Sequence, residues 1–345
     1  MRGKTVKKVR AITVFAIAAL CASGLAACST SAENAGTDSA ANPVVLKVAF
    51  NQPETHPQYI AMVNFGKKLK KETKGAYEIK MFPNELLGSQ QDTIAGVQSG
   101  SIDMSIVAGS LLENVNPAFV AFNLPYVFDS QEQQVAVLSD PAITGDLYKS
   151  MEDKGLDVVA GFTGGTRNVY TKDKAVKTPK DLSGLKIRVI QSDTMVAMMK
   201  LMGGVGTPMG QGDVYTAIQS GVLDGGENNE LIYNSLKHDE IAPNYSYTKH
   251  LMMPDFLIMN SKVLAKMTTD QKKIFTDGLI AASSEEATLW NKTVATAVKD
   301  AKAAGAKFND VDTAAFKKAV EPLVKEKLAA SPEAKKLYDA VQDHK

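Results

Sequence analysis

The sequence predicts an α/β protein of two lobes, each a mostly parallel sheet flanked by helices. Its length of 345 residues suits two domains of ordinary size better than one. Residues 44–107 alternate β-type runs with helical patterns, and residues 181–229 do so again, which is the alternation that builds parallel sheets. Hydrophobic residues make up 44% of the chain and charged residues 22%, as in a soluble globular protein with enough apolar material for two cores.

The N-terminal stretch, residues 1–27, has the pattern of a secretory signal peptide. A basic start is followed by an apolar run over residues 11–22 and by small residues before Cys28. Residues 25–28, Leu-Ala-Ala-Cys, resemble a bacterial lipobox, which implies cleavage before Cys28 and acylation of its thiol. An ordinary signal in which Cys28 is incidental is the alternative. Cys21 lies inside this leader, so the mature protein has no cysteine pair and cannot form an internal disulfide.

The charge of the mature protein argues against nucleic-acid binding. The leader carries five Lys and Arg residues and no acids, so removing it takes the formal net charge from +1 to −4. A mildly acidic protein lacks the basic stripe that nucleic-acid binding requires. We therefore expect no nucleic-acid partner.

The first lobe is expected over residues 43–164, after a flexible linker of small and polar residues at 28–42. Its first strand is a nearly continuous β-type run, which suits burial on both faces. Helical spacing and strict alternation of apolar residues then follow in turn. The predicted opening elements are strand 44–50, helix 59–69, strand 77–81, helix 92–98 and strand 102–107.

The second lobe is expected over residues 165–249, with residues 250–290 returning to the first lobe and 291–345 added to the second. The β-forming composition of residues 244–260 indicates this return, and Trp290 is the only tryptophan. The remaining predicted elements are helices within 130–153, strands at 156–162 and 167–171, one long or two abutting helices over 268–304, and amphipathic helix over 314–344.

Residues 181–229 are predicted to form strand, helix, turn, helix and strand. Arg188 lies on a short strand, on the face opposite Ile187 and Val189. Ser192 is a candidate cap for the next helix, whose methionines fall at helical spacing. The final strand runs into Asn228 and Asn229. Arg188 and these amides therefore lie at strand ends, where open α/β sheets place ligands.

The sequence resembles the solute-binding proteins of TRAP (tripartite ATP-independent periplasmic) transporters over nearly all of the mature chain. The matching segments, in family order and spacing, are Phe82-Pro83-Asn84-Glu85-Leu86-Leu87-Gly88, residues 98–104, Leu124-Pro125-Tyr126-Val127-Phe128, Gly165-Thr166-Arg167, residues 184–189 and residues 219–228. The resemblance implies a periplasmic-binding-protein-like fold in which a long helix bridges the two lobes. It also implies a monomeric extracytoplasmic receptor that delivers a small organic acid to a membrane permease, without a cofactor.

Arg188 is the strongest candidate for binding the ligand. A guanidinium binds a carboxylate through two parallel hydrogen bonds, a geometry that lysine cannot match. The resemblance gives Arg188 the role of carboxylate anchor and Arg167 a supporting role. It also matches Asn228 to a ligand-binding amide, which can both donate and accept hydrogen bonds. Asn229 is a further candidate, whereas Glu227 is a candidate for holding the hinge.

Four more candidates rest on weaker signals. His56 follows the first strand and His250 lies where the chain returns between lobes, and both resemble positions used by the uronate-binding branch. A structural or surface histidine is the alternative for each. Asp92 is either a ligand-binding residue or an acid favoured by the N-terminus of its helix. Gln211 stands where relatives often have an aromatic residue, so ring stacking on the ligand is not expected there.

The expected ligand is a hexuronate, glucuronate or galacturonate, with a C4-dicarboxylate or another sugar acid as the alternative. This rests on the resemblance of residues 187–193, Met198-Met199 and residues 227–229 to the hexuronate-binding branch. A secreted lipoprotein enzyme acting on uronates is a second hypothesis, and a sensor-associated receptor a third. The sequence has none of the common catalytic motifs, and its clustered methionines fit a helix core better than a metal site. We therefore predict a receptor without enzymatic activity, metal or cofactor.

Overall fold

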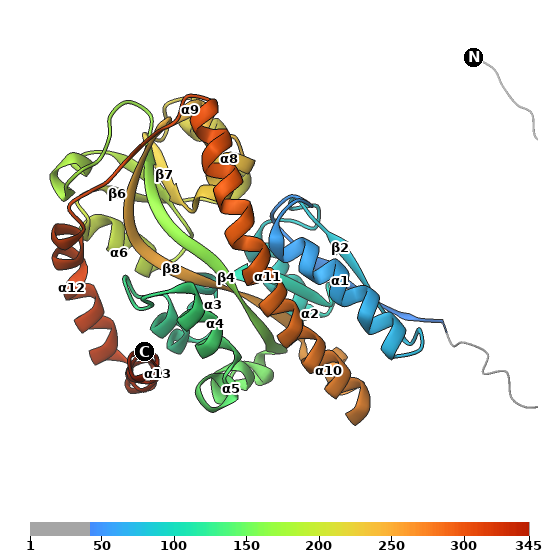
Figure 1. The fold of residues 1–345 in the computed structure, drawn as a ribbon. Coiled ribbons are helices and arrows are strands. Elements are labelled where there is room, and N and C mark those ends of the chain that lie inside the picture. Colours follow the sequence, from blue (N-terminus) through green and yellow to red (C-terminus); the bar gives the residue numbers. More distant parts are fainter. Residues whose placement is uncertain (1–41, 345) are drawn as a thin grey trace, which may run out of the picture. The chain divides into compact units, whose positions relative to one another are not determined.

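The computed structural model describes residues 42–344 (Figure 1). The predicted signal peptide, the lipidation site at Cys28 and nearly all of the predicted linker lie outside these residues. The described chain opens with the expected βαβαβ unit. Its elements are β1 (Val44–Ala49), α1 (Pro57–Glu72), β2 (Tyr77–Phe82), α2 (Gln90–Ser99) and β3 (Met104–Ala108). Both β2 and β3 pair with β1 in parallel, as predicted.

Two long strands join the lobes into a single sheet. They are β4 (Leu156–Thr171) and β8 (Asn244–Asn260), and they pair with each other in antiparallel orientation. The two strands predicted at 156–162 and 167–171 are therefore one strand. Irregular pairing between Thr163 and Thr166 marks the place where the sequence suggested a break. Pairing runs in the order β2-β1-β3-β8-β4-β7-β5-β6, and β9 (Lys307–Asn309) pairs with β8.

The second parallel part of the sheet comes from residues 186–228. Its elements are β5 (Lys186–Val189), α6 (Asp193–Leu201), β6 (Val205–Pro208), α7 (Val214–Gln219) and β7 (Gly225–Asn228). The short strand β6 was not predicted. Its Gly206 allows close packing under α6, because an added Cβ would lie 3.1 Å from the Val196 backbone. Ser192 occupies the N-cap position of α6 as predicted, but its side chain makes no capping hydrogen bond.

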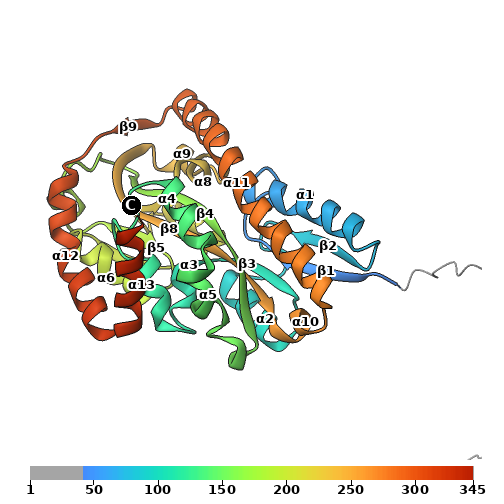
Figure 2. The same ribbon diagram turned by 60° about the horizontal axis from the view of Figure 1, so that its bottom comes forward.

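Helix α11 (Thr269–Ala303) is one continuous 35-residue helix. Thr268 and Gln271 form a capping box at its start. Phe275 and Leu279 pack into the core shared with β1 and α1, whereas Trp290 packs near the other end with Leu231 of α8 (Glu230–Ser235). Figure 2 shows α11 running beside α1 and on past it. The predicted long helix therefore contacts both lobes.

The other helices pack around the sheet, and the last two form the C-terminal end of the chain. They are α3 (Gly109–Leu112), α4 (Gln131–Ser139), α5 (Pro141–Lys149), α9 (His238–Ile241), α10 (Ser261–Ala265), α12 (Thr313–Ala330) and α13 (Pro332–Asp343), with 3-10 turns η1 (Pro117–Phe122), η2 (Glu152–Lys154), η3 (Pro179–Leu182) and η4 (Gln211–Asp213). Helix α12 packs on α6, and α13 packs on η1. Within residues 42–344, none of the helices is long and apolar enough to cross a membrane.

Candidate ligand-binding site

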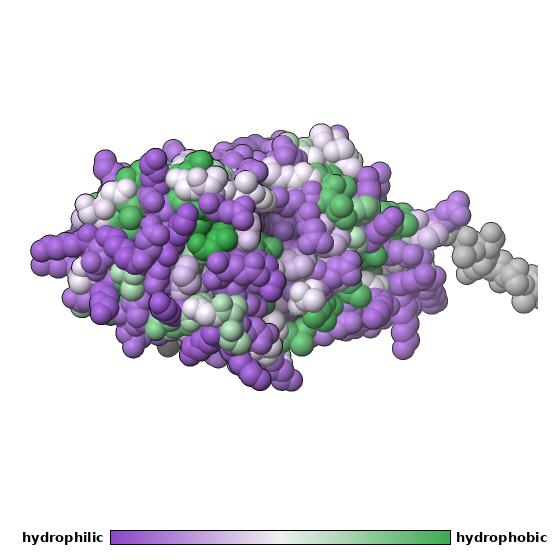
Figure 3. All heavy atoms as spheres, turned by 90° about the horizontal axis from the view of Figure 1, so that it is seen from above, coloured by the Kyte–Doolittle hydropathy of each residue, from purple (hydrophilic) through white to green (hydrophobic). Residues whose placement is uncertain are grey.

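A cavity with about 590 Å³ of empty volume, part of it open to solvent, lies between the two parallel parts of the sheet. Its polar wall is rich in carboxamides: Asn51, Gln52, Gln90, Gln191, Gln211, Asn228 and Asn229. Its apolar wall consists of Ala108, Leu111, Ile190, Ile232, Met253 and Trp290. Figure 3 shows that the face seen from above is largely hydrophilic, with separate hydrophobic patches.

Arg188, on β5, is 4% exposed and lines this cavity. Its Nε and Nη2 donate to the Met209 carbonyl oxygen at 2.9 and 2.8 Å, and its Nη1 donates to Gln211 Oε1 at 3.3 Å. A guanidinium has five N–H groups, so one remains on each Nη atom. These two can form the parallel pair of hydrogen bonds that a carboxylate accepts. Burial lowers the pKa of Arg188, although Glu227 opposes that effect. A buried arginine without its own carboxylate is suited to an anionic ligand.

Arg167, on β4, lines the same cavity but already has a partner. Its Nε and Nη2 donate to the two carboxylate oxygens of Glu227 at 2.5 and 2.8 Å, and Nη2 also donates to the Glu227 carbonyl oxygen at 2.8 Å. Its Nη1 donates to Asn228 Oδ1 at 3.1 Å. Burial alone would raise the pKa of Glu227, but Arg167 outweighs it and holds the pKa below its usual range. Arg167 therefore has one N–H group left for a ligand.

Three amides complete the wall beside the arginines. Asn228 Nδ2 donates to Gln211 Oε1 at 3.4 Å, so Gln211 accepts from both Asn228 and Arg188. The Gln211 Nε2 atom is buried and has no hydrogen-bond partner among residues 42–344. Asn229 caps α8, because its Oδ1 accepts from the Ile232 N–H at 2.8 Å, while its Nδ2 donates to the Gly164 carbonyl oxygen at 2.8 Å. A buried donor without a partner in a cavity wall indicates a place for a ligand acceptor.

His56 reaches the cavity from the first lobe. It is the N-cap of α1, and its Nδ1 accepts from the Gln58 N–H at 3.3 Å. Burial lowers its pKa to about 3, so the ring is neutral at physiological pH. Because Nδ1 accepts, Nε2 carries the proton and can donate. The ring packs edge-on against Phe50 and Trp290, with centroids 5.3 and 5.4 Å away.

The two other predicted residues do not line the cavity. His250 is fully buried behind Glu227, with its Nε2 3.4 Å from Glu227 Oε2 and its Nδ1 2.9 Å from Thr248 Oγ1. It therefore supports the Arg167–Glu227 pair. Asp92 accepts hydrogen bonds from the Ser89 N–H and hydroxyl at 3.0 and 2.6 Å, forming the capping box of α2. This is the helix-terminal role that the sequence offered as its alternative.

Several cavity residues were not predicted from the sequence. Asn51, Gln52 and Glu85 lie in the loops after β1 and β2, and Gln90 begins α2. Their position at the carboxyl ends of predicted parallel strands, where ligands bind, is the feature of the sequence that could have identified them. Gln52 Oε1 is buried and has no hydrogen-bond partner among the described residues. The cavity wall therefore offers an unpaired acceptor as well as the unpaired Gln211 donor. Trp290 of α11 could not be placed from its local sequence, because it reaches the cavity only through the tertiary packing of α11.

The charges of the cavity wall leave one arginine without a carboxylate partner. Among the described residues that line the cavity, the cations are Arg167 and Arg188, and the acids are Glu85 and Asp255. Burial raises the pKa of Asp255 to about 6, against a hydrogen bond from Gln58 and the charge of Arg167. Glu227 neutralises Arg167 from behind. Arg188 can therefore form an ion pair with one ligand carboxylate, and the amides supply hydrogen-bonding groups for a polar body.

Residues 48–331 match the family model DctP, described as bacterial extracellular solute-binding protein, family 7. The 2,3-diketo-L-gulonate-binding periplasmic protein YiaO of Escherichia coli K12 is 30% identical, over 97% of this chain and 99% of its own. The C4-dicarboxylate-binding protein DctB of Bacillus subtilis is 25% identical, over 73% of this chain and 70% of its own.

Solved structures are similar in both sequence and fold. A TRAP periplasmic solute-binding protein from Anaerococcus prevotii, with bound D-glucuronate, has a TM-score of 0.85 and 38% identity, covering 87% of this chain and 97% of that one. One from Xanthobacter autotrophicus, with bound β-D-galacturonate, has a TM-score of 0.83 and 32% identity, covering 86% and 99%. These matches confirm the predicted fold and the predicted family. The chain belongs to the DctP family and is a solute-binding protein of a TRAP transporter.

Proposed function

We propose that this receptor captures a hexuronate, such as D-glucuronate or D-galacturonate, and presents it to its TRAP membrane permease. The observation that carries this proposal concerns Arg188. Among the described residues that line the cavity, it is the arginine without a carboxylate partner, and it lies in a wall with seven carboxamides. Hydroxyl groups both donate and accept hydrogen bonds, as carboxamides do, so a polyhydroxylated acid satisfies this wall. The uronates bound by similar structures are consistent with that chemistry.

In the proposed complex, the ligand carboxylate accepts from the two remaining N–H groups of Arg188. Gln211, Asn228 and the last N–H of Arg167 contact the carboxylate or its neighbouring hydroxyl. His56 donates from the opposite lobe, and Trp290 covers the less polar face of the sugar ring. The ligand then touches both lobes. Contacts that form only when the lobes are closed stabilise the closed arrangement relative to the open one.

The lobes are proposed to hinge where β4 and β8 pair irregularly. We assign residues 43–164 and 250–290 to the first lobe, and 165–249 and 291–345 to the second. The bulge between Thr163 and Thr166 falls at this boundary. An added Cβ on Gly165 would lie 2.4 Å from Trp290 Cζ2, so the hinge strand contacts α11 directly. Because α13 packs on η1, the C-terminal helices contact the first lobe as well.

The place of the receptor in the cell is proposed from its family and its N-terminal pattern. Members of this family are extracytoplasmic receptors. Cleavage before Cys28 and acylation of its thiol would tether a monomeric receptor to the membrane through the Ser- and Ala-rich linker. The receptor would then deliver ligand to permease subunits in the same membrane.

Calorimetry and melting curves with D-glucuronate, D-galacturonate, D-glucose and succinate test the proposal. We expect the uronates to bind, and at 100 times the dissociation constant to stabilise the protein by about 2.7 kcal/mol. Glucose should fail to bind, because it would displace water from Arg188 without supplying a negative partner. Equal affinity for glucose and glucuronate would refute the proposal, as would slow conversion of the bound uronate to product.

A further inference from the structure

Glu85 reaches the cavity from a turn with an unusual backbone. Asn84 and Glu85 both have φ of 56°, in the left-handed region that residues other than glycine rarely occupy. Hydrogen bonds from Glu85 N–H to the Phe50 carbonyl oxygen, at 3.1 Å, and from Gly88 N–H to the Glu85 carbonyl oxygen, at 2.9 Å, hold this turn. Such conformations are unfavourable and persist where the surroundings fix them. The turn gives the Glu85 side chain a defined direction.

That direction is across the cavity, toward the second lobe. An added Cβ on Gly212 would lie 2.6 Å from Glu85 Oε2, so the carboxylate packs directly on the η4 turn. The Gly212 backbone lowers the pKa of this carboxylate, as a nearby N–H group does. Burial raises the pKa of Glu85, and the positive charge of Arg188 opposes that rise. The two groups therefore sense each other's charge from opposite sides of one cavity.

We propose that Glu85 determines specificity by rejecting a second carboxylate on the ligand and accepting a hydrogen bond from a hydroxyl in its place. This inference rests on the proposed hexuronate function. A dicarboxylate anchored on Arg188 retains another negative charge inside the cavity, with Glu85 and Asp255 in the wall and no further unpaired cation among the described lining residues. A hexuronate instead presents hydroxyl donors, for which a carboxylate is a strong acceptor. A repulsive element of this kind discriminates between ligands that share the same anchor.

A ligand pair tests the proposal on the wild-type protein. Succinamate has the shape of succinate, but a neutral amide replaces its second carboxylate. Competition against D-glucuronate should give succinamate at least tenfold higher affinity than succinate. Equal affinities would overturn the role of Glu85 without requiring any variant to fold.

Glu85→Gln then assigns the effect to this residue. Its preference for succinamate over succinate should fall at least tenfold, while D-glucuronate binding weakens because a charged acceptor is lost. The matched control is Asp213→Asn, which removes an acid beside Gly212 that does not line the cavity and should keep the wild-type preference. The two proteins and the two ligands together form a double-mutant cycle. The cycle measures the coupling free energy between the charge on Glu85 and the second charge on the ligand.

The outcomes separate this inference from the proposed function. If Glu85→Gln binds D-glucuronate and keeps the wild-type preference for succinamate, Glu85 does not select the ligand, although the receptor still binds uronates. If the wild-type protein binds succinate more tightly than D-glucuronate, both the inference and the hexuronate function fail.

Discussion

Replacing Arg188 with alanine is the most direct test of the site. The substitution removes both N–H groups that the structure leaves available for a ligand carboxylate. Truncating one partner of a desolvated, hydrogen-bonded charge pair costs about 2–5 kcal/mol, much of it from leaving the other charge unpaired. At about 1.4 kcal/mol per decade, D-glucuronate should bind roughly thirty- to several-thousand-fold more weakly. Arg188→Lys should recover only part of this loss, because an ammonium cannot form the planar pair.

Stability needs its own control, because Arg188 is buried even without a ligand. At 4% exposure, its guanidinium satisfies the Met209 carbonyl oxygen and Gln211 Oε1. Leaving buried acceptors unsatisfied costs about 1–3 kcal/mol each, whereas removing a buried, unpaired charge offsets part of that cost. Melting curves should therefore accompany calorimetry at 25 °C. A folded Arg188→Ala protein that binds D-glucuronate within a few-fold of wild type would refute the reasoning, and Arg167 would be the next anchor to test.

Three further predictions address the scaffold, the anchor and the pH response. Arg167→Met should destabilise the fold by about 3–5 kcal/mol in denaturant titrations, because it strands the buried Glu227 carboxylate; an unchanged midpoint would contradict this. Cys28→Ser should release the protein from membrane fractions without changing its uronate affinity, and persistent membrane association would count against acylation. Burial raises the pKa of Glu113 to about 7, although hydrogen bonds from groups including Thr194 oppose this rise. The folded protein therefore binds the proton more tightly than the unfolded chain does. The resulting stabilisation is complete below about pH 4.5 and is lost as the pH rises through 7. Glu113→Gln should therefore gain about 1–3 kcal/mol relative to wild type between pH 5 and pH 8, whereas parallel melting profiles would exclude this.

The sequence was most informative where local pattern and tertiary structure agree. Parallel strands and their helices follow from apolar periodicity, and the sequence pattern alone places Arg188 near a strand end. The continuity of β4 could not be predicted, because Gly164-Gly165 looks like a break. In the structure these glycines allow close approach instead, with Gly164 against the Met253 backbone and Gly165 against Trp290. These contacts join residues that lie far apart in the sequence, so local pattern does not reveal them.

The same limit explains why some candidate site residues line the cavity and others do not. His56 follows a β-forming segment and His250 lies within one. Their local sequences do not reveal which of the two faces the cavity. The β7-β4-β8 pairing decides this, because it places Glu227 between His250 and the cavity. Glu85 lies within the family segment 82–88, but its sequence pattern did not predict that it lines the cavity. Its reach depends on two left-handed residues, Asn84 and Glu85. Asparagine adopts this conformation more readily than most residues, but glutamate does so rarely, so the sequence does not predict it at Glu85.

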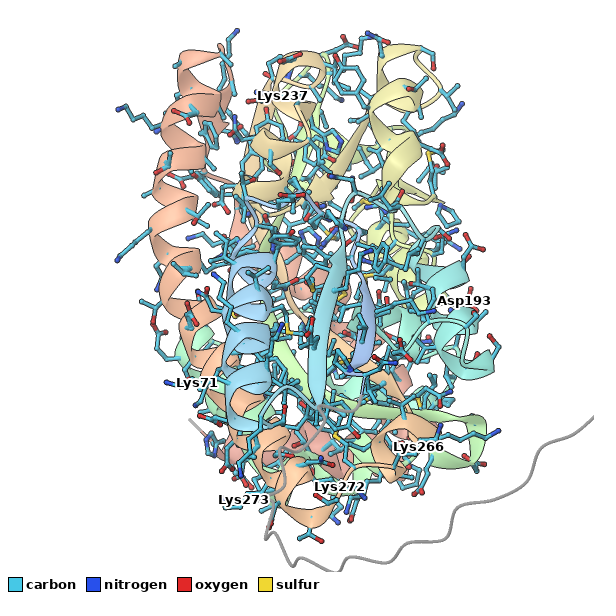
Figure 4. The ribbon with its side chains drawn as sticks, turned by 90° about the vertical axis from the view of Figure 1, so that its right-hand side faces the viewer. Lys71, Asp193, Lys237, Lys266, Lys272 and Lys273 are labelled. Carbon is cyan, nitrogen blue, oxygen red and sulfur yellow. The ribbon has the colours of Figure 1, made fainter. Side chains whose placement is uncertain are left out.

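The two arginines show why charge alone is a poor guide to the ligand of this protein. Two buried guanidinium groups in one cavity suggest a dianion, and a C4-dicarboxylate would then be the natural candidate. Arg167, however, is buried and forms a fork with Glu227. Figure 4 shows α11 extending beside α1 from Lys272 and Lys273 toward the level of Lys237. The charge of Arg167 is used within the protein, where its pair with Glu227 joins β4 to β7. Only Arg188 remains to balance a ligand charge, and Glu85 faces it from the other side. The amides then have to be satisfied by hydroxyl groups, and for this reason a sugar acid fits the site better than a dicarboxylate.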